Sequence, residues 1–277
     1  MKYLLVVGII LCCSMEAYSQ TTVKGTILDA ETSLPIPYVN IGITQLRKGT
    51  VSDSNGKFTL GYNSKSDSVT ISAIGYFTRK MTVQDIFKSR EISLVPKVYQ
   101  VEDIVVYAKT LGDEKILGNK IKKKEQSISF GNANLGTEIG VKVEVKRKTR
   151  IESAHFIINF VGAEDLLYRV NIYKMDGDKV GENLLPENVI IQGKQMKGTL
   201  SVDLSKYEMV IEGEVLLSLE YIEGSLDSNM GIAFRSKKVP RRKADTFMKY
   251  TSLSEYRKFE FVNYQLGFYL VGREVVE

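Results

Sequence analysis

His155 is the only histidine in this chain of 277 residues, and it limits the catalytic chemistry that the sequence can support. A zinc site of the carboxypeptidase type needs two imidazoles and a carboxylate around the metal, so a single imidazole does not complete it. A serine–histidine pair would have to use the same residue, and no Gly-x-Ser-x-Gly elbow, phosphate-binding loop or dinucleotide fingerprint occurs. Because His155 stands beside Phe156, Ile157 and Ile158, we expect a buried, hydrogen-bonded and neutral strand residue. We therefore predict no catalytic, cofactor-binding or metal-binding residues and no cofactor.

Three other arrangements of charged residues could carry chemistry. Asp176, Asp178 and Glu182 offer oxygen ligands for a cation such as calcium, but they lack the spacing of a calcium-binding loop, and a turn at Gly177 is the favoured interpretation. The basic run Lys237–Lys243 could meet phosphates, an acidic glycan or a protein, although short runs of like charge mostly lie in solvated loops. Hydrolysis by paired carboxylates stays open, because a sequence does not show which acidic side chains meet.

The N-terminus predicts export. The apolar run Leu4–Cys13 is too short to span a bilayer, and Ala17 and Ser19 stand where a signal peptidase requires small residues. We expect removal of residues 1–19 and a location in the periplasm or at the outer membrane. Lipidation at Cys12 is the alternative, and the bulky residue before this cysteine disfavours it. The mature chain then has no cysteine and no disulfide.

The region that follows the signal peptide has the alternation of strands with one buried face. Apolar side chains occupy every second position in 39–43, 58–62 and 69–73. The cluster Asp-Ser-Asn-Gly at 53–56 predicts a hairpin turn. Pro35 cannot donate to a ladder, so its strand is expected to begin at a sheet edge or a bulge.

Four motifs occur in order in this region: Gly-x-x-x-Asp at 25–29, Pro-x-x-x-Ile at 37–41, Asp-x-x-Gly-x-Phe at 53–58 and Ser-x-x-Gly-Tyr at 72–76. The succession resembles the carboxypeptidase regulatory-like domain, a transthyretin-like β-sandwich. The resemblance implies such a sandwich over residues 20–107. It implies no particular activity, because these modules serve different purposes in different proteins.

Residues 101–106 resemble the segment that joins this module to the plug of TonB-dependent outer-membrane receptors. No plug and no receptor barrel are expected to follow. Residues 108–135, with the basic run 120–124 and several glycines, predict a linker in which a short helix could form around Ile116 and Leu117.

Beyond the linker, short alternating runs separated by Gly and Asp predict a second β-sandwich over residues 136–277, of jelly-roll type, with a turn at 147–149. The stretch 168–173 is similar to part of a C-terminal domain that accompanies the regulatory-like module in exported proteins of Bacteroidota. That similarity implies a fold and a lineage. The predicted fold class is thus all-β, with two β-sandwiches in tandem.

Charge and composition favour no particular ligand. The formal net charge of +5 is small and spread along the chain, so we expect no nucleic-acid partner. We predict a non-catalytic exported binding or assembly module of the cell envelope, whose partner is an envelope protein or a glycan. An accessory glycan-binding protein, which would need a concave face lined with aromatic residues, is the first alternative. A hydrolase with an unrecognised carboxylate site is the second.

Overall fold

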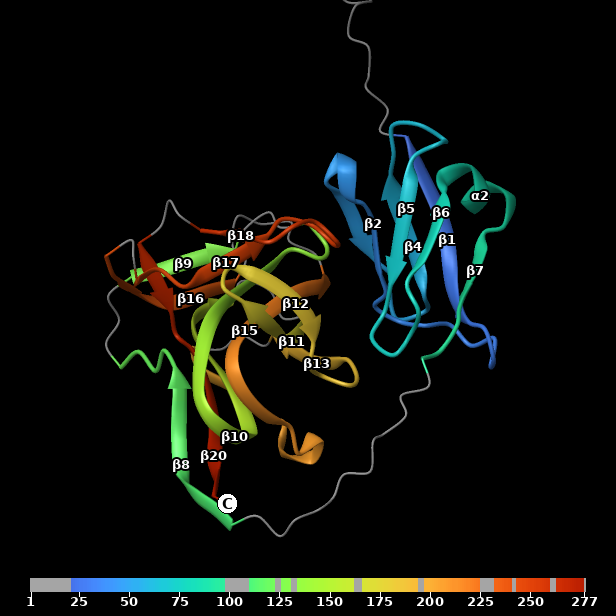
Figure 1. Ribbon diagram of the computed structural model, residues 1–277. Coiled ribbons are helices and arrows are strands. Elements are labelled where there is room, and N and C mark those ends of the chain that lie inside the picture. The colour runs from blue at the N-terminus through green and yellow to red at the C-terminus, as the bar shows by residue number, and fades with distance from the viewer. Residues whose placement is uncertain are drawn as a thin grey trace, which may run out of the picture.

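The computed structural model describes residues 21–97, 110–122, 126–130, 134–161, 166–193, 197–224, 232–240, 243–259 and 263–276. The predicted signal peptide at 1–19 and the receptor-like segment at 101–106 lie outside these residues. Within them, no helix is long and apolar enough to cross a membrane. The described chain consists mainly of β-strands, which confirms the all-β prediction (Figure 1).

Two sheets pack against each other in the N-terminal part of the chain (Figure 1). Alternate side chains of their strands enter a shared apolar core that includes Val23, Ile41, Phe58, Leu60 and Ile71. This part is therefore a β-sandwich, as expected. The first sheet contains, in order, β4 (Lys57–Gly61), β1 (Thr22–Asp29) and β7 (Glu91–Leu94); the second contains β3 (Lys48–Val51), β2 (Asn40–Ile43), β5 (Ser68–Ser72) and β6 (Arg79–Thr82); the 3₁₀ turn η1 (Thr44–Leu46) follows β2, and helix α2 (Val83–Lys88) joins β6 to β7.

The motif residues of this sandwich have structural roles. The carboxylate of Asp53 accepts a hydrogen bond from the backbone N–H of Lys57 at 2.9 Å, and Gly56 between them adopts a φ of +71° that favours glycine. Tyr76 donates its hydroxyl hydrogen to Asp29 at 2.9 Å, so the end of one motif is tied to the end of another. The motifs that carry the resemblance are therefore explained by the fold.

The rest of the described chain forms a hydrogen-bonded sheet that bends around a second apolar core. Its main path runs through β12 (Lys179–Asn183), β11 (Leu166–Asp176), β15 (Val210–Glu223), β10 (Glu138–Val161), β16 (Ile232–Lys238) and β19 (Tyr264–Leu266). Strand β10 also pairs with β14 (Gly198–Asp203), β17 (Thr246–Lys249) and β20 (Phe268–Val276). The first part of β10 pairs with β15 and β17, and its last part pairs with β14, β16 and β20. The two layers expected of a jelly roll are therefore joined through this one long strand. The remaining elements are β8 (Thr110–Gly118), β9 (Gln126–Phe130), β13 (Val189–Gly193), β18 (Arg257–Lys258) and the 3₁₀ turn η2 (Ser205–Tyr207).

Two sequence-based expectations in this half are wrong. Ile116 and Leu117 lie in β8, which pairs with β20, so the described part of 108–135 contains strand where a short helix was expected. The expected turn at 147–149 lies inside the continuous strand β10. The register of β10 against β15 shifts between Val145 and Thr149, so the polar residues between them form an irregularity of the strand and not a turn. The division into domains at residues 107 and 136 stays a prediction.

Phe58 provides a test of the first core. Its side chain is 5% exposed and packs against the backbone at Gly25, so Phe58→Ala should lower the free energy of unfolding by about 3–5 kcal/mol, as truncations of buried aromatic residues do. The matched control is Phe77→Ala, because Phe77 is 58% exposed and its removal should change stability by less than about 1 kcal/mol. Denaturant unfolding of both variants checks this, and equal losses would contradict the inward placement of Phe58.

Candidate functional site

Arg169 links the two sandwiches through several hydrogen bonds. Its side chain is 2% exposed, and its Nε and Nη2 donate to Oε2 of Glu220 at 2.9 and 2.8 Å. The same guanidinium reaches into the N-terminal sandwich, where Nη1 donates to the backbone oxygen of Tyr38 at 2.8 Å and Nη2 to Oδ1 of Asn40 at 3.0 Å. A further bond runs from Nη1 to Asn188 at 3.0 Å. Every N–H of the guanidinium thus has an acceptor.

Arg169 belongs to a row of charges across four adjacent strands, β11, β15, β10 and β17. Arg169 faces Glu220, Glu220 faces Glu138, and Glu138 faces Lys249 in the strand register. The Nζ of Lys249 lies 2.6 Å from Glu138 and 3.4 Å from Glu220. Two positive and two negative side chains therefore balance one another. We call these four residues the charge row.

The neighbouring charges in the row favour the ionised forms of Glu220 and Lys249 although both are buried. Burial acts against the charge of Glu220, but Arg169 and Lys249 outweigh it and lower the pKa of this carboxyl. Burial also acts against the charge of Lys249, and its two glutamate neighbours outweigh it and raise the pKa of the ammonium. The row therefore contributes electrostatic attraction between side chains that are at most 6% exposed.

The paired carboxylates of the row bear on the hydrolase alternative. Glu138 and Glu220 share the side-chain N–H₂ of Asn171, at 2.9 and 3.3 Å. Hydrolysis by such a pair needs contact with the substrate and one acid with a raised pKa. Both side chains are 0% exposed and the pKa of Glu220 is lowered, so this pair is suited to holding Arg169 and Lys249 rather than to acid–base catalysis.

Glycines allow the two sandwiches to approach closely beside Arg169. Gly42 and Gly49 face each other on β2 and β3, and a Cβ at Gly49 would lie 2.4 Å from the backbone oxygen of Ser252. Ser252 donates its hydroxyl hydrogen to Asn40, the residue that Arg169 also binds, at 2.9 Å. We call Gly42, Gly49 and the turn at Ser252 the glycine notch.

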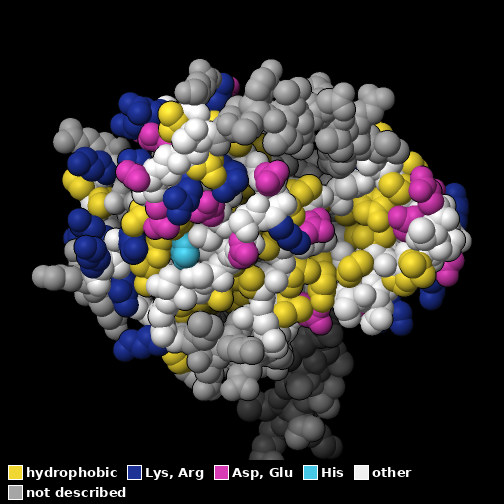
Figure 2. Space-filling model, turned by 90° about the horizontal axis from the view of Figure 1, so that it is seen from below, with side chains coloured by type: hydrophobic (Ala, Val, Ile, Leu, Met, Phe, Trp, Pro, Cys, Tyr) yellow, Lys and Arg dark blue, Asp and Glu magenta, His cyan; other side chains and the backbone are white. Residues whose placement is uncertain are grey.

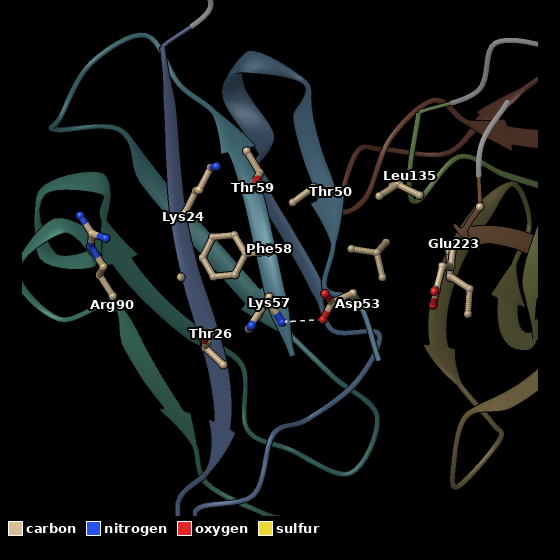
Figure 3. A pocket seen from close by; sticks show the side chains of 14 residues that line it. Lys24, Thr26, Thr50, Asp53, Lys57, Phe58, Thr59, Arg90, Leu135 and Glu223 are labelled. Atoms are coloured by element: carbon tan, nitrogen blue, oxygen red, sulfur yellow. Dashed lines mark hydrogen bonds between the residues drawn. The ribbon is translucent and has the colours of Figure 1, made fainter. Parts of the chain in front are cut away.

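Several clefts flank this junction, and the smallest of those described, of about 370 Å³, is lined by Thr44, Tyr250 and Arg257. Two others are larger. The first, of about 670 Å³, lies between β3 and β4 on one side and the end of β15 on the other, and we call it the β4 cleft (Figure 3). The second, of about 550 Å³, is lined by Tyr173 and Tyr256 of the C-terminal part and by the segment 72–75 of the N-terminal sandwich, and we call it the tyrosine cleft. Both volumes lie in the range of small-molecule sites.

His155 does not lie in the second core, as the sequence led us to expect, but half-buried on the outer face of its sheet, and the chain's only imidazole is visible at the surface in Figure 2. Its ring stacks on Tyr269 with centroids 4.5 Å apart. The hydroxyl oxygens of Ser153 and Ser201 lie 2.8 Å from Nε2 and Nδ1 respectively. The expected hydrogen bonding is thus present. Desolvation, together with the charge of Lys120, lowers the pKa of the imidazole and favours its neutral form.

The serine–histidine contact at His155 has the spacing of a nucleophile and its base. It lies on β10 between β14 and β20, where the ladders on both sides use the backbone N–H groups that could otherwise stabilise an oxyanion. None of the clefts described above includes Ser153 or His155. The geometry therefore favours a structural role for this pair.

Of the other sequence-derived candidates, Glu182 is exposed and lines the tyrosine cleft, whereas Asp178 and the described part of the basic run line neither this cleft nor the β4 cleft. Asp178 lies in the turn with Gly177 and is 3.1 Å from the Nζ of Lys258, so a lysine of the chain occupies the position of a counter-ion. Among the described residues, no group of three or more acidic, histidine or cysteine side chains is arranged to hold a metal ion. Of the basic run, Lys237 and Lys238 end β16 and are exposed, and residues 241–242 lie outside the described residues.

Sequence reasoning missed the charge row, although a signal for it exists. In 168–173, Arg169, Asn171 and Tyr173 alternate with apolar residues, which places an arginine on the face opposite the core. An arginine in a strand is usually solvated. Only the position of the N-terminal sandwich over that face shows that Arg169 is buried.

Comparison with known proteins identifies the first sandwich. The family model of the CarboxypepD_reg-like domain matches residues 23–106. No curated protein matches the chain. Among solved structures, the cysteine protease and lectin-like domains of Cwp84, a surface layer associated protein of Clostridium difficile, are similar with a TM-score of 0.42 and 9% identity, over 82% of this chain and 46% of that chain. The clostridial cysteine protease Cwp84 after propeptide cleavage gives a TM-score of 0.41 and 10% identity, over 82% of this chain and 51% of that chain. The chain spans about half the length of these proteins.

Arg169→Met tests the energetic role of the charge row. The substitution leaves Glu220 buried with one cation fewer, so the free energy of unfolding should fall by about 3–5 kcal/mol. The double variant Arg169→Met/Glu220→Gln removes the excess charge and should recover more than half of that loss. Denaturant unfolding measures both. The control is Lys206→Met, which breaks the exposed pair with Glu187 and should leave stability almost unchanged. Stability of Arg169→Met equal to that of the native chain would contradict the assignment.

His155 gives a prediction about pH. Since the pKa of its imidazole is lowered in the folded chain, the unfolded chain binds more protons below about pH 6.5. Stability should therefore fall as the pH decreases through that value, and His155→Gln should remove this part of the pH dependence. Titration of the single imidazole by NMR should give a pKa below 6.5, the ordinary value. A value above 6.5 would contradict the desolvated environment described here.

Proposed function

Because residues 23–106 form a carboxypeptidase regulatory-like domain, we propose that the chain works as a non-catalytic binding or assembly module of the cell envelope, with the junction between its two sandwiches as the binding region. Export to the periplasm or the outer membrane is part of this proposal, and so is an origin in Bacteroidota. The regulatory-like domain itself is a β-sandwich module and supplies no catalytic group by its family identity.

One observation carries the proposal: Arg169 binds both sandwiches at once, through Glu220 on one side and Tyr38 and Asn40 on the other. A linkage of this kind fixes the relative orientation of two surfaces, which a shared binding site requires and which independent modules on a flexible tether do not have. The β4 cleft and the tyrosine cleft are both lined by residues of the two sandwiches, so their shape depends on that orientation.

Glycan binding is a second candidate that one observation favours. In the tyrosine cleft, the rings of Tyr173 and Tyr256 meet edge to face with centroids 5.7 Å apart. Lys97 and Glu182 stand exposed on the lining of this cleft. Aromatic rings with polar groups beside them suit the faces and hydroxyls of a saccharide.

The glycine notch gives a variant that disturbs the junction with little effect on either core. Gly49→Ala places a Cβ where the backbone of Ser252 lies, so the two sandwiches must move apart. Immobilised protein of residues 20–277 should capture a component of detergent-solubilised envelope, and Gly49→Ala should lose that capture and give a larger radius of gyration by X-ray scattering. The purified component should bind the native chain saturably.

The matched control is Gly112→Ala, because a Cβ there would meet its nearest neighbour at an ordinary 3.5 Å. This variant should bind as the native chain does. Capture that survives Gly49→Ala although the scattering shows separated sandwiches would contradict the role of the junction. Turnover of a peptide or glycan substrate by the purified protein would contradict the non-catalytic assignment.

A further inference from the structure

The β4 cleft has an apolar floor and two walls of opposite charge (Figure 3). Val51, Phe58 and Ile222 form the buried apolar part of its lining, and Leu135 is partly buried beside them. The cleft is long enough in one direction to include Arg90 on the N-terminal sandwich and Glu223 on the other side of the junction. These features suit an extended ligand with a small apolar contact surface.

The first wall is basic. Lys24 on β1 and Lys57 on β4 point outward from the sheet, where each lies opposite a threonine of the neighbouring strand, and Arg90 precedes β7. All three side chains belong to exposed residues. None of the three has a carboxylate within salt-bridge distance among the described residues, in contrast to Lys142, which is 3.0 Å from Glu214. The basic wall therefore has charge available for an anionic ligand.

The second wall contains Glu223, at the end of β15. Burial of Tyr38 beside this carboxylate, together with the charge of Glu223, raises the pKa of that tyrosine to about 12. The carboxylate oxygen Oε2 is buried and has no hydrogen-bond partner among the described residues. A buried oxygen of this kind is costly without a donor, so it marks a position where a ligand N–H or ammonium would be stabilised.

The floor between the walls includes an open strand edge. Strand β4 ends the order β4-β1-β7, so among the described strands only β1 pairs with it. Phe58 and Thr59 of β4 line the cleft, and the turn at Asp53 closes one end of the edge. The backbone N–H and C=O of Lys57 already bond to Asp53, so the open part of the edge begins beyond this residue, at Thr59. A peptide group of a ligand that crosses β4 can pair there.

We propose that the β4 cleft binds an extended acidic peptide segment whose free amino group meets Glu223 and whose carboxylates meet Lys24, Lys57 and Arg90. The inference rests on the proposed function and names the ligand class of one cleft at the junction. The complementary charges set the direction of the peptide, because its amino end lies at β15 and its acidic residues lie over β1 and β4.

The test uses a synthetic hexapeptide, Gly-Val-Thr-Asp-Glu-Asp, with a free amino end and a fluorophore at its carboxyl end. Fluorescence anisotropy with the mature chain should show saturable binding that weakens with salt. Acetylation of the peptide and Glu223→Gln in the protein should each weaken binding about tenfold or more. Both changes together should weaken it no further than one alone, because they remove the same contact.

Control variants separate the cleft from the general charge of the protein. Lys24→Ala/Lys57→Ala should weaken binding and flatten its salt dependence, whereas Lys80→Ala, on exposed β6, should not. Glu212→Gln, an exposed glutamate on the same strand as Glu223, should bind as the native chain does. Acetylation changes only the peptide, so the test of the Glu223 contact does not depend on whether the protein variants fold.

Equal binding of the acetylated and free peptides, or no binding of either, would overturn the inference. The inference would also be overturned if the peptide did not bind but a chitin-type oligosaccharide did, and if Glu223→Gln weakened binding of the oligosaccharide. If the peptide fails but Gly49→Ala still abolishes capture of the envelope component, the ligand class is wrong and the proposed function stands. If capture survives in Gly49→Ala, the proposed function fails independently of the peptide.

Discussion

The bond pattern of one buried guanidinium determines how the parts of this structure fit together. Arg169 donates two hydrogen bonds to Glu220 of its own sandwich. It donates two more to Tyr38 and Asn40 of the other sandwich. Because the guanidinium is planar and rigid, satisfying all of its donors at once leaves little freedom to either partner. The geometry of this side chain, together with the glycine notch and the bond from Ser252 to Asn40, therefore sets the orientation of the two sandwiches.

The charge row explains why a buried charge is tolerated at this position. An isolated guanidinium would be too costly to desolvate, but Glu220, Glu138 and Lys249 neutralise it and one another across four strands. Apolar residues of the same volume could stabilise the junction as much as the charge row does. They would not fix the orientation of the two sandwiches, since apolar contacts are non-directional. The glycine notch allows the backbones of the two sandwiches to approach each other at Ser252. The β4 cleft and the tyrosine cleft lie beside this contact, where the surfaces of the two sandwiches separate.

The sequence predicts features that depend on neighbouring residues, but not contacts between residues far apart in the chain. The N-terminal sandwich was predictable because the turn at 53–56 and the burial of Phe58 depend on neighbours within a few residues or on strand alternation. Helix α2 could also have been found, since Thr82 and Asp85 form a capping box. The junction could not, because Tyr38 and Arg169 are 131 residues apart and only folding brings them together. His155 was misplaced because its apolar neighbours lie on alternating faces of the sheet.

The central claim is that the two sandwiches have one fixed orientation, and a distance measurement across the junction tests it most directly. The chain beyond residue 19 contains no cysteine, so Lys80→Cys on β6 and Lys146→Cys on β10 provide a unique pair of exposed sites for spin labels. Double electron–electron resonance should give a single narrow distance distribution. The same labels in Arg169→Met should give a broader one. A broad or multimodal distribution in the otherwise native chain would contradict the account, because it would show that Arg169 does not fix the junction.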